Sequence, residues 1–245
     1  MRNNTVVLIV LSVSLLFASC AKEGPTGPTG PAGPSYVGSI SGHVTLYDQY
    51  GMKVLVGVDS VRLTISGTTT YVNPDNSGYY AYNYIATGEY NITATDSGYG
   101  ATNTNNFQFL SGTFNKDIGL SAIPSFSLTV TTGAGGGYDT LNVGCTADPN
   151  IRSVVIFVSN TASVSNVPAS FLLSFAKNIP ANATKVPVYI SAQELYDAGF
   201  ASGSEVYYAV YSHSANDASA YEDQTTGKMV YNAVSYPQID SAIVP

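Results

Sequence analysis

The two histidines are the residues of this chain best suited to acid–base catalysis or metal binding, but the sequence around them argues against catalysis. Neither His43 nor His213 stands in a His-x-x-Glu or His-Glu-x-x-His motif of the kind that binds catalytic zinc. Serine is abundant, but a serine nucleophile needs a histidine base, and no Gly-x-Ser-x-Gly turn occurs. We therefore expect no catalytic residue, no metal and no cofactor, and a protein that is not an enzyme. His43 falls on the polar phase of its segment and should be exposed.

The carboxylates and the thiols also give no clear sign of a metal site or a reactive group. Asp217, Glu222 and Asp223 can supply the oxygen ligands that Ca²⁺ prefers, but their spacing is irregular, so we favour a solvated acidic loop. Cys145 ends the alternating pattern Leu141-x-Val143-x-Cys145, which predicts a buried, inert thiol on a strand. The only other cysteine is Cys20, so no disulfide framework is expected.

Tyrosine is the candidate residue type for binding a ligand, since the chain has 19 tyrosines, although the absence of tryptophan counts against a strong sugar platform. On a strand, Tyr80, Tyr82 and Tyr84 share one face and Tyr79 takes the other. If that face is buried, the rings are core with their hydroxyls at the rim; if it faces solvent, it is a flat platform on which sugars stack. We favour packing and keep Tyr80, Tyr82 and Tyr84 as candidate ligand-stacking residues.

The elements that must position these side chains are strands. Apolar and polar residues alternate with period two in segments separated by Gly, Asn, Asp and Pro turns, which indicates antiparallel sheets with one buried face. The pattern predicts an all-β protein with two antiparallel β-sandwiches in tandem, at 36–123 and 124–236, followed by a C-terminal tail at 237–245.

Two short stretches depart from the period-two pattern and predict helices. Phe171, Leu172 and Phe175 follow Pro168 at helical spacing, which predicts a short helix within 168–177. The sequence Ser191-Ala-Gln-Glu194 is a capping box, and Gly199 supplies a stop, so we expect a helix of one or two turns between them.

The N-terminus carries a targeting pattern. Residues 1–19 contain one basic residue, an apolar run too short to cross a bilayer, and small residues directly before Cys20, as in a cleaved signal peptide. This pattern resembles the bacterial lipoprotein signal, although Phe17 stands where that family has an aliphatic residue. The resemblance implies export, lipidation of Cys20 and attachment to the outer membrane; an ordinary secretory signal is the alternative. Residues 20–35 are rich in Gly and Pro and predict a semi-stiff tether.

The first sandwich resembles the carboxypeptidase regulatory-like domain, which is common in exported Bacteroidetes proteins. The resemblance is carried by Ile40-x-Gly42-x-Val44, Val58-x-x-Val61-x-Leu63, Asp75-x-x-Gly78-x-Tyr80, Ile85-x-x-Gly88-x-Tyr90-x-Ile92 and Gly98-Tyr99. It implies a transthyretin-like sandwich related to starch-binding domains, in which some members bind glycans, and it carries over no catalytic residue.

The second sandwich resembles the late part of an immunoglobulin-like or fibronectin type III domain. The resemblance is carried by the run Gly203-Ser-Glu-Val-Tyr207-Tyr-Ala-Val-Tyr211 after the short helix. It implies that Tyr207 or Tyr208 is a corner tyrosine.

Charge and composition limit the partners. The formal net charge is −7, with 9 Lys and Arg against 16 Asp and Glu, so we expect no binding to nucleic acid. We expect a lipid-anchored, non-catalytic binding or structural module that takes carbohydrate through its first sandwich. The alternative is an adhesin-like or spacer protein that binds another envelope protein through its second sandwich.

Overall fold

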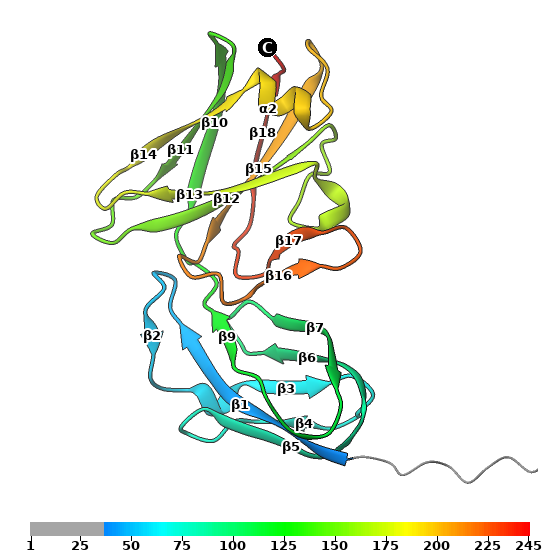
Figure 1. The fold of residues 1–245 in the computed structure, drawn as a ribbon. Helices are drawn as coiled ribbons and strands as arrows, with labels where there is room; N and C mark the ends of the chain where they lie inside the picture. The colour runs from blue at the N-terminus through cyan, green and yellow to red at the C-terminus, as the bar shows by residue number, and fades with distance from the viewer. Residues whose placement is uncertain (1–36) are drawn as a thin grey trace, which may run out of the picture. The chain divides into compact units, whose positions relative to one another are not determined.

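Alternating apolar and polar residues build two β-sandwiches, each with its own hydrophobic core (Figure 1). The computed structural model describes residues 37–245. The expected signal peptide at 1–19, Cys20 and the tether at 20–35 lie outside the described residues. The all-β sandwich architecture predicted from the sequence is confirmed.

The first sandwich packs two sheets against each other. One sheet is centred on β1, which pairs with β2, β5, β8 and β9; the other has the order β4-β3-β6-β7. Its elements are β1 (Val37–Tyr47), β2 (Lys53–Val54), a 3-10 turn η1 (Val58–Ser60), β3 (Arg62–Ile65), β4 (Tyr71–Val72), β5 (Tyr79–Ala86), β6 (Gly88–Thr95), β7 (Thr102–Phe109), β8 (Gly112–Asn115) and β9 (Ile118–Ser121).

Strand β1 uses both of its edges along most of its length. On one edge it pairs antiparallel with β5 and then β2, and on the other it pairs in parallel with β8 and then β9. The parallel pairs were not expected from the sequence, because a period-two pattern gives the buried face of a strand and not the direction of its neighbour.

The tyrosines of β5 do not form the ligand-stacking face considered above. Tyr80 and Tyr82 are 1% and 5% exposed and belong to the core; Tyr80 donates a hydrogen bond to the Lys116 carbonyl (2.6 Å) and Tyr82 one to the Leu63 carbonyl. Burial raises the pKa of Tyr82 to about 12. Tyr84 is 88% exposed because a bulge opposite β1 inserts it as an extra residue with φ of 61°. The packing interpretation therefore holds for Tyr80 and Tyr82.

The second sandwich has a three-stranded sheet, β10-β11-β14, and a four-stranded sheet, β13-β12-β15-β18. Its sandwich strands are β10 (Leu128–Gly135), β11 (Tyr138–Cys145), β12 (Arg152–Ser159), β13 (Leu173–Ile179), β14 (Lys185–Ser191), β15 (Glu205–His213) and β18 (Gln238–Ile243). If β10, β11, β12, β13, β14, β15 and β18 are lettered A, B, C, C′, E, F and G as in immunoglobulin-like domains, the two sheets are ABE and C′CFG. The fourth strand thus joins the third instead of the fifth, unlike the constant-type arrangement of ABED and CFG.

Three local expectations for this half meet different outcomes. The capping box is confirmed: α2 (Ala192–Asp197) begins at Ser191, whose hydroxyl accepts from the Glu194 amide, and Gly199 follows with φ of 95°. The helix expected within 168–177 is wrong, since only a 3-10 turn η2 (Pro168–Ser170) forms before β13 pairs with β12. The expected tail at 237–245 instead contains β18, which completes a sheet.

The core of the second sandwich contains a hydrogen-bonded acid. Tyr208 is fully buried and donates to Asp139 Oδ2 (2.6 Å), and burial raises the pKa of both groups. Tyr208 thus contacts a side chain of the opposite sheet, and the corner-tyrosine prediction is wrong for this residue. Cys145 packs against the core at the end of β11 but is only half-buried, so the predicted burial of its thiol is met only in part.

Truncating the buried ring of Tyr80 should destabilise the protein. We expect Tyr80→Ala to lower the free energy of unfolding by about 3–5 kcal/mol, because it leaves a large cavity in the first core. Tyr84→Ala is the matched control and should change it by less than about 0.5 kcal/mol, since that ring is exposed. Denaturant titration measures both; equal effects would contradict the assignment of core and surface rings.

Candidate functional site

A hairpin inserted between β15 and β18 connects the two sandwiches. It consists of β16 (Ala220–Asp223) and β17 (Lys228–Tyr231). Strand β17 belongs to the second sandwich: Lys228 Nζ donates to the carbonyls of Pro168 (2.8 Å) and Phe171, and the Tyr231 ring packs edge-on against Phe157. Strand β16 lies beside β7 of the first sandwich. The hairpin therefore contacts both halves of the compact unit that the described residues form.

Hydrogen bonds between side chains and backbone groups join the sandwiches. The Ser121 amide donates to Ser219 Oγ (2.8 Å), and that hydroxyl donates to the Gly100 carbonyl (2.7 Å). Ser121 Oγ donates to the Asn216 carbonyl (2.7 Å). Asn232 Nδ2 donates to the Ala101 carbonyl (2.6 Å). We call this set of contacts the joint.

Two glycines let the backbones approach closely at the joint. A Cβ on Gly100 would overlap the backbone of Asn232 and Ala233, and a Cβ on Gly119 would come within 2.7 Å of the Ala218 Cβ. Both glycines belong to the first sandwich and all three facing residues to the second. The requirement for glycine here comes from the space that the other sandwich occupies.

Beside the joint lies a polar groove of about 350 Å³, with walls from both sandwiches. Strand β7 and the segment that joins β8 to β9 form one side, and β16 with the start of its turn forms the other. The groove is lined by Thr102, Asn103, Thr104, Asn105, Phe107, Lys116, Asp117, Ile118, Gly119, Ala218, Ala220, Tyr221, Glu222 and Gln224. Of these fourteen residues, six carry an amide or a hydroxyl, three carry a charge and two are aromatic, so polar side chains are the majority.

A bulge in β7 shapes the wall of the groove. The register with β6 shifts between Tyr90 and Ile92, and Asn106 has φ of 49°, with its amide donating to Asn91 Oδ1 (2.6 Å). The extra residue breaks the ladder locally, as bulges do at strand edges. Asn105 projects across the groove and donates through Nδ2 to the Glu222 carbonyl on β16 (3.2 Å).

The charged residues of the groove are Lys116, Asp117 and Glu222. Asp117 accepts from the His43 amide (2.8 Å), and its side chain is 70% exposed; Glu222 on the opposite wall is also exposed. Lys116 is held by its backbone, which donates to the Ser41 carbonyl and accepts from Tyr80. The His43 side chain is 58% exposed, as its position in the strand pattern predicted.

The structure separates the residues that the sequence singled out. Tyr80 supports the groove from below through Lys116, Tyr82 lies in the core, and Tyr84 lines a different hollow with Val37 and Thr113. The polar run 102–106 was missed as a site. Its signal in the sequence is five consecutive polar residues, Thr-Asn-Thr-Asn-Asn, in a segment flanked by strand patterns.

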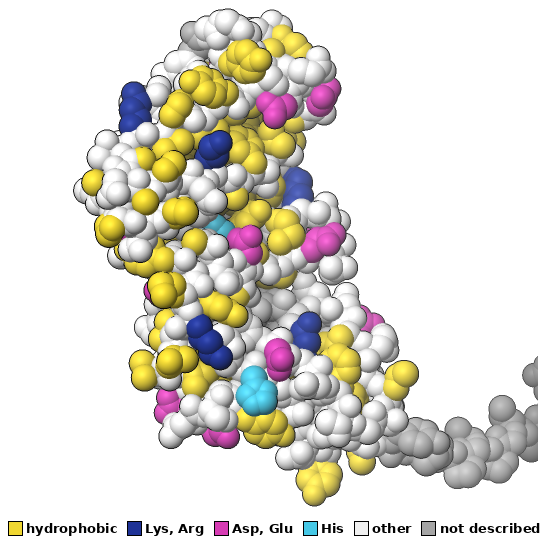
Figure 2. All heavy atoms as spheres, turned by 60° about the vertical axis from the view of Figure 1, so that its left-hand side comes forward, with side chains coloured by type: hydrophobic (Ala, Val, Ile, Leu, Met, Phe, Trp, Pro, Cys, Tyr) yellow, Lys and Arg dark blue, Asp and Glu magenta, His cyan; other side chains and the backbone are white. Residues whose placement is uncertain are grey.

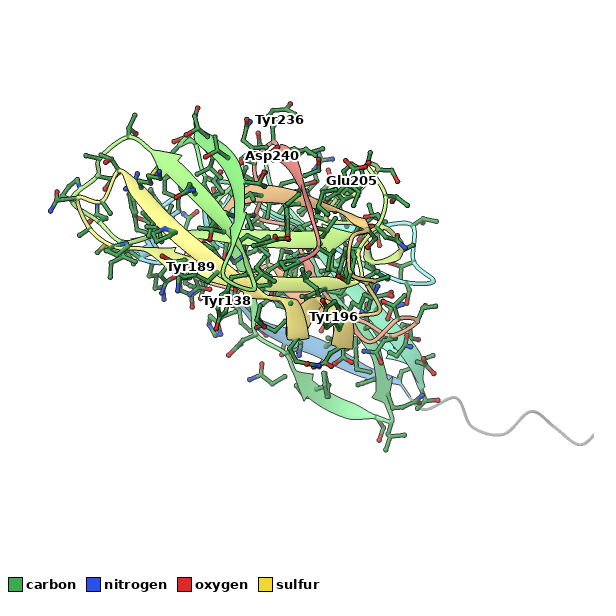
Figure 3. All side chains as sticks on the ribbon, turned by 90° about the horizontal axis from the view of Figure 1, so that it is seen from above. Tyr138, Tyr189, Tyr196, Glu205, Tyr236 and Asp240 are labelled. Carbon is green, nitrogen blue, oxygen red and sulfur yellow. The ribbon has the colours of Figure 1, made fainter. Side chains whose placement is uncertain are left out.

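A second exposed surface lies on the outer face of β11 and β14. Tyr138 and Tyr189 are 48% and 64% exposed and lie close together on neighbouring strands (Figure 3). Tyr138 is opposite Ser191 and Thr140 opposite Tyr189, so the two rings are diagonal neighbours on one face. On the adjacent strand β10, Gly133 lies opposite Thr140 and Gly135 opposite Tyr138. A Cβ on either glycine would meet no atom within 4 Å.

Metal and membrane features are absent from the part of the chain that the structure describes. No three His, Cys, Asp or Glu side chains of residues 37–245 group closely enough to hold a metal ion. Asp217 is instead paired with His213, and Asp223 accepts from the Thr226 amide. No helix within that range is long and apolar enough to span a bilayer. The face shown in Figure 2 carries isolated charges and no continuous patch of one sign.

The class of protein that this architecture defines is an all-β sandwich protein. No family model and no curated protein matches the chain. Among solved structures it is similar to a candidate carbohydrate-binding protein from Bacteroides uniformis, with 16% identity, 86% of this chain and 100% of the other covered, and a TM-score of 0.32. A DUF3823 family protein from Parabacteroides merdae shares 15% identity over 73% of this chain and 92% of its own, with a TM-score of 0.28. These TM-scores are too low to assign a fold or a function.

The buried imidazole beside the joint should make stability depend on pH. His213 is 2% exposed, with Nε2 3.2 Å from Asp217 Oδ1 and its ring edge-on to Tyr231. Burial lowers the pKa of His213, and the Asp217 charge opposes this only in part. As the pH falls below about 6.5, the unfolded state therefore takes up the proton first, and stability is lost.

Comparison with His213→Gln isolates this effect. We expect the free energy of unfolding of the wild type to fall relative to that of the variant between pH 7 and pH 5, measured by denaturant titration. Parallel curves for the two proteins would show that the buried imidazole does not set this dependence.

Proposed function

We propose that this chain is a non-catalytic binding module that takes a saccharide in the groove between its two sandwiches. The observation that carries the proposal is the lining of the groove, which includes the amide residues Asn103, Asn105 and Gln224 and the aromatic residues Phe107 and Tyr221. An amide both donates and accepts hydrogen bonds, which suits a ligand whose hydroxyls do the same. Aromatic rings offer an apolar face to the C–H surface of a sugar.

The lining also argues against other small ligands. Pockets for apolar molecules are lined mainly by hydrophobic side chains with few polar groups, and this groove has the opposite composition. Its volume of about 350 Å³ lies at the small end of ligand sites, which suits a short segment of a saccharide.

Binding without catalysis is the better supported activity. Glycoside hydrolysis uses a pair of carboxyl groups, one of them kept protonated by its environment. Asp117 and Glu222 are both exposed, so neither has the apolar surroundings that such an acid requires.

Export and anchoring complete the proposal. The signal pattern of residues 1–19 and the position of Cys20 support a lipoprotein attached to the outer membrane, and the Gly-Pro tether supports a spacer between lipid and sandwich. Two or three acyl chains make such attachment stable, since each buried methylene contributes about 0.8 kcal/mol.

A second candidate function is binding of an envelope protein through the second sandwich. It is favoured by the exposed pair Tyr138 and Tyr189, because tyrosine is enriched at protein interfaces. The groove is preferred as the primary site because it is hollowed and is lined mostly by polar residues from both sandwiches.

A polysaccharide screen tests the primary site. The fragment 35–245 should bind at least one of starch, laminarin, xylan, mannan and pectin, measured by affinity electrophoresis and calorimetry. The double variant Tyr221→Ala, Gln224→Ala should weaken that binding about tenfold or more, since it strips one groove wall of its ring and an amide.

The matched control is Tyr138→Ala, Tyr189→Ala, which removes two exposed rings on the other surface. We expect it to bind as the wild type does. Loss of binding in this control with retention in the groove variant would move the site to the second sandwich. No binding to any of the five polysaccharides would reject the proposed function for these ligands.

A further inference from the structure

We infer that the ligand of the groove locks the two sandwiches together, so that binding and docking of the sandwiches are one coupled equilibrium. This inference rests on the proposed function, because it concerns the same groove. It goes further in assigning to the β16–β17 hairpin the role of a wall that is present only while the sandwiches are docked.

The hairpin contributes to the groove but is rooted in the other sandwich. Its β17 strand is fixed by Lys228, and Asn166 Nδ2 donates to the Tyr231 carbonyl (3.4 Å). Its β16 strand supplies Tyr221 and Glu222 to the groove, opposite Asn105 and Lys116 of the first sandwich. If the sandwiches separate, the hairpin leaves with the second one and the groove loses a wall.

The joint is polar, which keeps its free energy small. The hydrophobic clusters of the described residues are confined to one sandwich each: one spans Ile40–Leu120, and the others lie after Leu128. Besides the close backbone approach at Gly100 and Gly119, the contacts across the joint are mainly hydrogen bonds, and each bond contributes only about 0.5–1.5 kcal/mol net, because water replaces it on opening. Domain interfaces of this kind permit relative motion unless they are large and apolar.

A ligand that touches both walls binds only the docked state. It therefore shifts the population toward that state by its difference in affinity for the two. Conversely, the observed dissociation constant rises in inverse proportion to the docked fraction. A change confined to the joint should thus weaken binding although it touches no groove residue.

Gly100 provides such a change. It does not line the groove, and the three atoms nearest to a Cβ placed there all belong to Asn232 and Ala233 of the second sandwich. Its backbone has no left-handed conformation that a side chain would strain. A valine at this position should therefore prevent docking while leaving the interior of each sandwich unaltered.

The test compares Gly100→Val and the milder Asn232→Ala with Gly133→Val, a control on an exposed strand position where a side chain meets nothing. Binding is measured with whichever of the five polysaccharides the wild type binds. Small-angle X-ray scattering reports docking, and circular dichroism reports folding of the sandwiches. Hydrogen exchange follows two backbone amides that donate from one sandwich to the other: that of Ser121, to Ser219 Oγ, and that of Ala215, to the Gln49 carbonyl (3.1 Å).

We expect Gly100→Val to weaken binding tenfold or more with both sandwiches folded, Asn232→Ala to weaken it less, and Gly133→Val to leave it unchanged. In the wild type, the polysaccharide should slow exchange at Ser121 and Ala215. Full binding by Gly100→Val in an undocked state, or unchanged exchange at the joint, would overturn the coupling while the proposed function stands. Failure of the wild type to bind any of the five would overturn both.

Discussion

The close approach of backbones at the joint is the constraint on which the remaining features depend. Gly100 and Gly119 bring one sandwich within hydrogen-bonding range of the other, and Ser121 and Ser219 then satisfy the backbone groups that this approach buries. Buried polar groups are costly when unpaired, so the arrangement is specific even though it adds little net stability. The position of β16 beside β7, and with it the groove, follows from this specificity.

The core of the first sandwich fixes the position of the opposite wall of the groove, which is the segment between β8 and β9. Tyr80 lies among apolar side chains, and its hydroxyl reaches the Lys116 carbonyl. The Lys116 amide donates to the Ser41 carbonyl. The Lys116 carbonyl lies so close to Gly42 that a side chain at position 42 would overlap it. The segment between β8 and β9 is thereby fixed from below. The groove thus has a wall set by core packing and a wall set by docking.

Local chemistry was predictable from the sequence, and long-range pairing was not. Ser191 and Glu194 defined α2 because their hydrogen bonds span three residues. Phe171 and Phe175 suggested a helix, but pairing of β13 with β12 decided otherwise, since tertiary contacts override weak propensity. Strand alternation predicted a common face for the tyrosines of β5, and the bulge that inserts Tyr84 altered it. The groove joins β7 to β16, more than one hundred residues later, so no local pattern indicated it.

Strand β18 fixes the order in which the molecule can be completed. It pairs with β15 near the last residue of the sequence, and Val244 is buried in the second core. Synthesis proceeds from the N-terminus, so one edge of β15 stays unpaired until residues 238–243 have been made. Unpaired strand edges can pair with strands of other chains. A chain that lacks residues 238–243 would leave that edge of β15 unpaired, and the free edge would favour association with other chains.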